Sequence, residues 1–140
     1  MIRAVIDTSV FIRYLIRPSA AIRTLIEELW LEDQVQVVTA PESLAELQGV
    51  LAEESIRRFI RPAEGQALLD SVLLKAEILP GLGPIPTFTC DPKDDKFVAC
   101  ALAGNAQAII TLDEDLLVLG SVGAAQILTP QTFVAGLRRG

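Results

Sequence analysis

Short apolar runs alternate along this chain with longer stretches in which apolar residues recur every three or four positions. The runs are typical of strands buried on both faces, and the periodic stretches are typical of helices that bury one face. We predict strands at residues 4–6, 35–38, 76–79, 108–110 and 125–128. The remaining stretches predict helices at residues 10–15, 20–31, 41–51, 62–73 and 92–103, a short turn or helix at 116–119, and a terminal helix after Thr129-Pro130.

Strands and helices that alternate in this way predict an α/β protein with a parallel sheet. We predict a single domain over residues 1–140, with a doubly wound, mostly parallel sheet flanked by helices and with residues 125–128 as its last edge strand. No apolar run approaches the length that crosses a bilayer, and no basic-then-apolar signal begins the chain. We therefore expect a cytoplasmic protein with no membrane contact.

Carboxylates follow two of the predicted strands directly. Asp7 comes after residues 4–6, while the strand at 108–110 leads through Thr111 to Asp113 and Asp115. The carboxyl ends of parallel strands lie at one edge of a sheet, where open α/β sheets bind their ligands. We therefore expect these acids to lie close together.

A further acid, Asp95, lies on an apolar helix face. It shares that face with Val98, Ala99 and Leu102. Attraction to the positive end of the helix dipole accounts well for Asp94. It accounts less well for an acid on the apolar side, which needs a cation or a hydrogen-bond donor as partner. We predict that Asp95 joins the acids at the strand ends.

Composition narrows the chemistry of such a group. The chain has no histidine, and its two cysteines, Cys90 and Cys100, lack the spacing of a metal site, so zinc is disfavoured. Clustered carboxylates repel one another unless a cation lies among them, and oxygen ligands suit Mg²⁺ or Mn²⁺. The net charge of −6 argues against nucleic-acid binding through a broad basic surface. It leaves open an enzyme whose cations neutralise its own acids.

Carboxylate-bound magnesium predicts phosphoryl or phosphodiester chemistry. A haloacid-dehalogenase phosphatase would have a second aspartate at position 9, where this chain has Ser9. A phosphoreceiver domain would need a lysine after a late strand, and no lysine follows Lys96. The P-loop pattern is also missing, and a ribonuclease H-like fold would begin with antiparallel strands.

Four fragments, in order, resemble the PIN-domain family. They are AVIDTSV, PESLAELQGVL, DPKDDKFVACALAGNAQAIITLDEDLL and ILTPQTFVAGL, which together span nearly the whole chain. The chain looks closest to VapC-type toxin components of toxin–antitoxin pairs. This resemblance implies a Mg²⁺- or Mn²⁺-dependent ribonuclease that cleaves RNA phosphodiester bonds, a homodimer, and a small antitoxin protein as partner. The alternative is an inactive PIN-like binding module that acts through dimer or partner-protein contacts.

The resemblance also implies roles for individual residues. The acidic quartet of the family matches Asp7, Glu46, Asp95 and Asp113, with Asp115 as a supporting metal ligand, and the choice of Glu46 rests on the family alone. Hydroxyls that orient these acids match Thr8, Ser9 and Thr111. Lys93 and Lys96 are possible RNA contacts, although a solvated helix start is the commoner role for such lysines.

Overall fold

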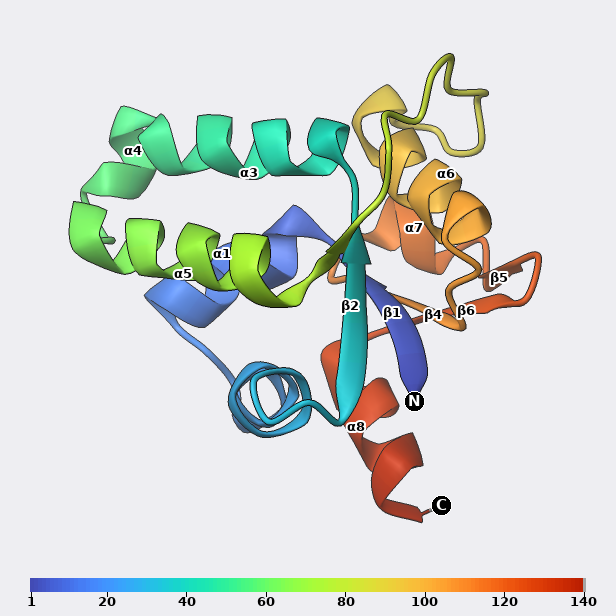
Figure 1. The fold of residues 1–140 in the computed structure, drawn as a ribbon, viewed down its shortest axis with the longest axis horizontal. Coiled ribbons are helices and arrows are strands. Elements are labelled where there is room, and N and C mark those ends of the chain that lie inside the picture. The colour runs from blue at the N-terminus through green and yellow to red at the C-terminus, as the bar shows by residue number, and fades with distance from the viewer. Residues whose placement is uncertain (140) are drawn as a thin grey trace.

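The computed structural model describes residues 1–139 and is built around one six-stranded sheet of order β3-β2-β1-β4-β6-β5 (Figure 1). All neighbouring strands are parallel except β5 and β6. The strands are β1 (Ile2–Ile6), β2 (Val35–Thr39), β3 (Glu77–Ile78), β4 (Ala108–Ile110), β5 (Ser121–Val122) and β6 (Ala125–Leu128). The helices are α1 (Thr8–Ile16), α2 (Ala20–Arg23), the π-helix η1 (Thr24–Trp30), α3 (Pro41–Ala52), α4 (Glu54–Arg57), α5 (Pro62–Lys75), the 3-10 helix η2 (Pro92–Asp94), α6 (Asp95–Ala103), α7 (Glu114–Leu117) and α8 (Pro130–Arg139).

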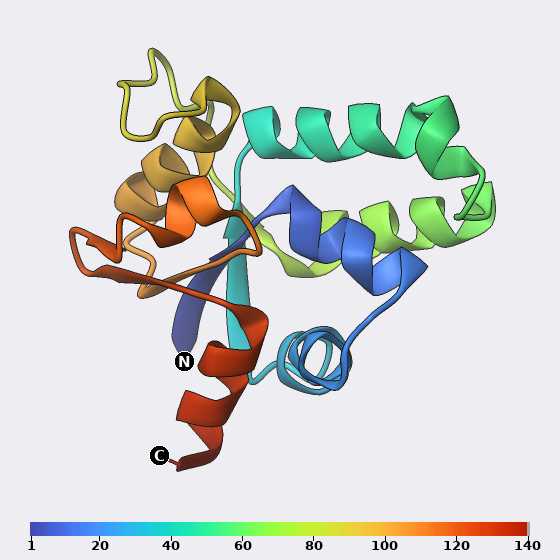
Figure 2. The same ribbon diagram turned by 180° about the vertical axis from the view of Figure 1, so that it is seen from behind.

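Two hydrophobic cores cover the two faces of the sheet, because successive strand residues point to opposite sides. Ala4 and Ile6 of β1 pack in the core formed with α1, η1, α5 and α8, whereas Val5 packs with α6 and α7. The views from the front and from behind show these two groups of helices on either side of the sheet (Figures 1 and 2). The predicted α/β fold, doubly wound and mostly parallel, is confirmed.

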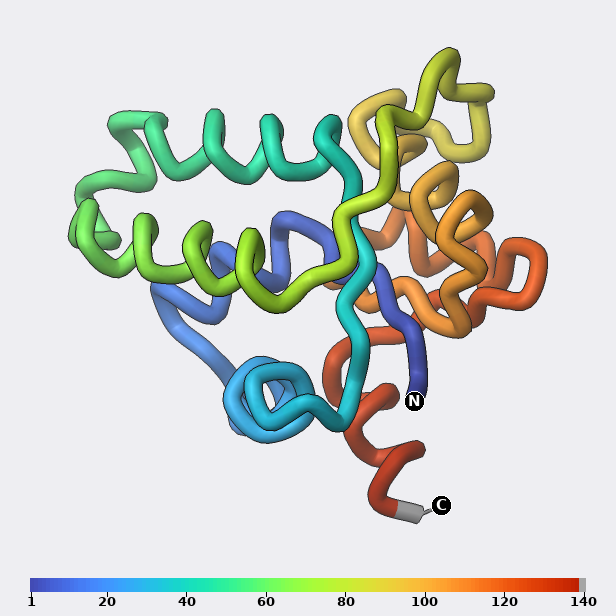
Figure 3. The backbone as a smooth tube through the Cα atoms, viewed as in Figure 1, coloured from blue at the N-terminus to red at the C-terminus, as the bar shows by residue number. Residues whose placement is uncertain are grey.

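The register of the central strands places the predicted acids at one edge. Ile6 pairs with Ile110, and the Asp7 amide donates to the Ile110 carbonyl at 3.0 Å. Both strands therefore end at the same level, and the chain leaves the sheet there at Asp7 and at Thr111. The loop between β3 and η2 passes beside α6 close to the same edge (Figure 3).

Two local predictions differ from the structure. The last edge strand is β5, which pairs with the outer side of β6 and so displaces residues 125–128 from the edge. The helix predicted over residues 20–31 is divided into α2 and the wider η1. Past the end of α6, Asn105 is left-handed, with φ of 52°. None of the helices in residues 1–139 is long and apolar enough to cross a membrane.

Candidate metal centre

A cleft of about 1090 Å³ opens at the carboxyl edge of the sheet, between α1, α3 and the turns before α6 and after β4. We call it the acidic cleft. Near the strand ends its polar lining consists of Asp7, Thr8, Ser9, Glu46, Asp91, Lys93, Asp94 and Asp113.

Four aspartates converge at one side of this cleft. Each offers one carboxylate oxygen, and these oxygens lie within 4.8 Å of one another. This aspartate cluster consists of Asp91, Asp94, Asp113 and Asp115. Two of its members are fixed by backbone amides: Asp91 Oδ1 accepts from the Lys93 amide at 3.0 Å, and Asp113 Oδ1 accepts from the Asp115 amide at 2.9 Å.

Asp94 is the buried member of the aspartate cluster, with 6% of its surface exposed. Its Oδ2 atom is buried and has no hydrogen-bond partner within the described part of the chain. Burial, the adjoining Asp113 carboxyl and the charges of Asp7 and Asp91 raise the pKa of Asp94 to about 8. An unpaired buried carboxylate is costly, so this oxygen is placed where a cation would stabilise it.

Asp7 lies at the end of β1 and caps α1. Its carboxylate accepts from the Ser9 amide at 3.2 Å, the Ser9 hydroxyl at 3.0 Å and the Thr111 hydroxyl at 2.6 Å. Burial raises the pKa of Asp7 against the lowering effect of these donors, and the charge of Glu46 adds to the rise. Thr111 also accepts from the Asp113 amide at 2.9 Å, which ties Asp7 to the turn that carries Asp113.

Glu46 lines the cleft from α3, outside the aspartate cluster. Its Oε1 atom accepts from the Thr8 hydroxyl at 2.6 Å, and its Oε2 atom accepts from the Lys96 ammonium group. Lys96 also donates to the Lys93 carbonyl. Lys96 is thus engaged in holding Glu46, whereas Lys93 lines the cleft.

The structure does not bring Asp95 to this site, and Asp94 occupies the expected place. Asp95 Oδ1 accepts from the Phe88 amide at 3.0 Å and the Thr89 amide at 2.8 Å. Burial alone would raise the pKa of Asp95, but these donors lower it below its usual value. The prediction that this acid needs a cation or a hydrogen-bond donor as partner is therefore met by two backbone amides.

Asp91 and Asp94 were not predicted as site residues, because the helix predicted over residues 92–103 assumed the α-helical repeat of α6 as far back as Pro92. Residues 92–94 instead form the 3-10 helix η2. Asp91 caps this helix and Asp94 is its last residue, three positions on, which is the repeat of a 3-10 helix; both carboxylates reach the aspartate cluster. The spacing of the two acids on either side of Pro92-Lys93 could have indicated this.

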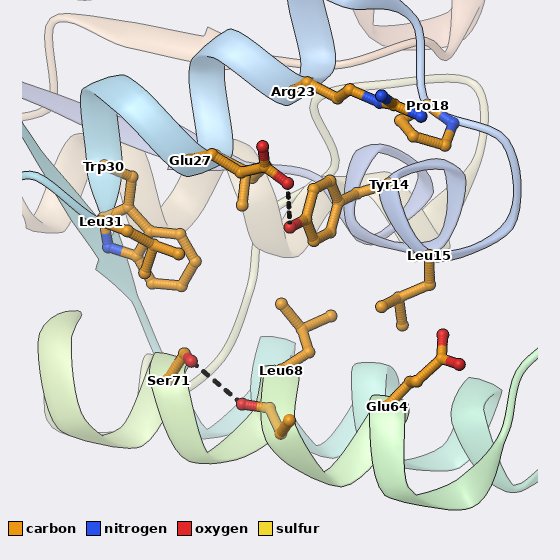
Figure 4. A pocket seen from close by; sticks show the side chains of 12 residues that line it. Tyr14, Leu15, Pro18, Arg23, Glu27, Trp30, Leu31, Glu64, Leu68 and Ser71 are labelled. Atoms are coloured by element: carbon orange, nitrogen blue, oxygen red, sulfur yellow. Dashed lines mark hydrogen bonds between the residues drawn. The ribbon is translucent and has the colours of Figure 1, made fainter.

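A second, smaller hollow of about 370 Å³ lies between α1, η1 and α5 (Figure 4). Tyr14 and Glu27 point toward each other across it, and the Tyr14 hydroxyl donates to Glu27 Oε2 at 2.7 Å. Burial and this carboxylate raise the pKa of Tyr14 to about 12. The carboxylate of Glu27 is already paired, so this hollow offers no comparable metal centre.

A comparison with curated proteins gave no match. Residues 3–115 match the family model of the PIN domain. The chain belongs to the PIN-domain family. This match covers every acid of the acidic cleft and confirms the resemblance that the sequence fragments indicated.

Solved structures with the same fold include two VapBC proteins. A chain in the crystal structure of VapBC2 from Rickettsia felis, bound to a DNA fragment from its promoter, has a TM-score of 0.60 and 17% identity, covering 90% of this chain and 97% of its own length. VapBC-5 from Mycobacterium tuberculosis, a member of the VapBC family of toxin–antitoxin systems, has a TM-score of 0.53 and 25% identity, covering 92% and 99%. This PIN domain is therefore similar to VapBC proteins over nearly its whole length.

Proposed function

We propose that this PIN domain is a Mg²⁺- or Mn²⁺-dependent endoribonuclease and the toxin of a toxin–antitoxin pair. The observation that carries the proposal is the aspartate cluster, in which Asp94 is buried and has an oxygen without a hydrogen-bond partner in the described part of the chain. Membership of the PIN-domain family supports a nuclease, and similarity to the VapBC proteins supports a toxin.

The donor set fits a hard divalent cation. Asp94 and Asp113 would hold it, with Asp91 and Asp115 beside them and Asp7 lining the same cleft. Carboxylate oxygens are the ligands that Mg²⁺ and Mn²⁺ prefer. Such a cation supplies the positive charge that stabilises a phosphodiester under attack by water.

The remaining side chains of the cleft would orient the water and the RNA. Asp7, fixed by three donors, presents its carboxylate in one orientation. Glu46, held in the same cleft by Thr8 and Lys96, is suited to accept a hydrogen bond from the attacking water and so orient it. Lys93, which lines the same cleft, is suited to contact a phosphate of the RNA.

Cleavage of a labelled, unstructured RNA tests the proposal. We expect cleavage by the wild type with Mg²⁺ or Mn²⁺ and none in chelator. Asp94→Asn and Asp113→Asn should abolish cleavage, while Asp70→Asn, a change of the same kind on the exposed face of α5, should not. An inactive binding module would show no metal-dependent cleavage by the wild type, and that result would overturn the proposal.

The toxin role and the homodimer need separate tests. Expression of the wild type should arrest growth of a bacterial host, whereas Asp113→Asn should not. A homodimer would cover exposed apolar side chains such as Phe59, Leu73 and Leu74, which are 69%, 58% and 85% exposed. Light scattering should then give twice the mass of the chain, and a monomer at high concentration would exclude the dimer.

A further inference from the structure

The acidic cleft continues beyond the aspartates, between α1 and α3. One face of α1 lines this extension with Ile12, Arg13 and Ile16, and so does Arg17, which caps the C-terminal end of the helix. Helical rise places Arg13 ~9 Å and Arg17 ~15 Å from Asp7 along α1. The two guanidinium groups, four residues apart, therefore follow one another on the side of the helix that leads away from the metal centre.

A neighbouring hollow of about 470 Å³ is bordered by the same two arginines and by Leu112, and it extends to Thr129 and Gln131. Arg13, Arg17 and Leu112 line both hollows, so the two lie side by side, and we call them together the groove. The arginines thus lie along the path by which a chain-like ligand would leave the aspartate cluster.

The α1 side of the groove carries positive charge and the α3 side carries negative charge. Both arginines are exposed, and neither takes part in an ion pair among residues 1–139. The opposite wall carries Glu53 of the α3 end. Attraction to the C-terminal end of the α1 dipole accounts for one basic residue there, but it does not require two guanidinium groups that line the groove.

We propose that Arg13 and Arg17 bind successive phosphates of a single-stranded RNA on one side of the cleaved bond. This inference rests on the proposed ribonuclease function. Glu53 would repel the phosphates and keep the backbone on the α1 side. The bases would contact Ile12, Ile16 and Val50, which only an unpaired strand can reach. No aromatic side chain lines this path in the described residues, so the phosphate contacts, and not stacking, should supply most of the affinity.

The test is the salt dependence of binding of a single-stranded RNA in chelator, where the proposed metal-dependent cleavage does not occur. Each phosphate contact contributes ~0.7 to the slope of log K against log salt concentration. Arg13→Gln/Arg17→Gln should therefore lower the magnitude of the slope by ~1.4. With Mg²⁺ present, so that the RNA is cleaved, the double substitution should raise KM more than it lowers kcat. The reason is that these side chains contact bound and reacting RNA alike.

The matched control is Arg57→Gln/Arg58→Gln, which removes the same charge from exposed positions at α4, outside the groove. Its slope should equal that of the wild type. If the wild type cleaves RNA and the slope of the groove variant is unchanged, or falls no more than that of the control, the inference about the arginines is wrong. If the wild type neither binds nor cleaves RNA, the proposed function itself has failed.

Discussion

Replacing Asp94 by Asn should stabilise the folded protein in chelator, because it removes one of the clustered carboxyl groups and keeps the shape. With a pKa of about 8, Asp94 is largely protonated at pH 7 in the folded state, whereas in the unfolded chain it is ionised, with a pKa of ~3.9. Keeping the proton on Asp94 lowers the free energy of unfolding by ~1.4 kcal/mol for each pH unit above the unfolded-state pKa. At pH 7 this destabilisation is at most ~4 kcal/mol. Water in the open cleft screens this to ~2 kcal/mol.

The assay is thermal unfolding in chelator at pH 7, where ~2 kcal/mol corresponds to a rise in Tm of ~4–8 °C for Asp94→Asn. Asp95→Asn is the matched neighbour and should melt lower than the wild type. Its carboxylate charge is stabilised by the Phe88 and Thr89 amides, and the substitution removes that charge. Adjacent, chemically identical substitutions should therefore shift Tm in opposite directions.

The pH dependence supplies a second readout. A carboxyl group whose pKa is raised on folding stabilises the folded state at acidic pH, and this stabilisation is lost as the pH rises toward the folded-state value. The advantage of Asp94→Asn over the wild type should therefore be small near pH ~4 and grow up to about pH 8. The folded-state pKa of Asp95 is lowered, so its contribution is present above the unfolded-state value and is lost only at lower pH.

Divalent cation should reverse the order of the wild type and Asp94→Asn. At a hundredfold excess over its dissociation constant, Mg²⁺ should stabilise the wild type by ~2.7 kcal/mol, because it binds the folded state alone. Asp94→Asn should gain less. If Asp94→Asn melts lower than the wild type in chelator, or gains as much from Mg²⁺, the assignment of Asp94 to a cation site is refuted.

Other expected outcomes follow from single contacts. Thr111→Val removes the 2.6 Å hydrogen bond to Asp7; it should lower both RNA cleavage and the free energy of unfolding, the latter by ~2 kcal/mol in denaturant titration. Gly104→Ala would place a methyl group 2.7 Å from Val38 Cγ1; it should cost ~1–3 kcal/mol of stability with kcat retained, and an unchanged stability would contradict this packing. Burial raises the pKa of the Cys100 thiol to about 12; mass spectrometry should find it unalkylated at pH 8 until the protein unfolds.

The sheet and the position of the site could be predicted from the sequence because they depend on local patterns. Buried runs placed β1 and β4, and the acids that follow them, Asp7 and Asp113, lie at the same cleft. Glu46 was different, since its helical phase resembles that of an ordinary surface acid. Its position depends on how α3 docks, and only the family resemblance indicated it.

The choice between Asp94 and Asp95 depended on a finer feature. Both acids lie in one turn, and which of them faces the cleft depends on whether that turn is α-helical or 3-10. The repeat of apolar residues along a whole helix does not reveal whether its first turn is α-helical or 3-10. The backbone amides that bind Asp95 come from the preceding loop, whose path no local pattern fixes.

The four members of the aspartate cluster all come from residues 91–115, a contiguous segment that contains η2, α6, β4 and the start of α7. Asp7 and Glu46 reach the same cleft from distant parts of the chain. Under the proposed function, binding of the cation and cleavage of RNA would therefore depend on different segments. Substitutions at Glu46 should abolish turnover while leaving calorimetric Mg²⁺ affinity nearly intact. Such a variant would be folded and would bind the metal. It would still bind RNA and any partner protein without cleaving the RNA.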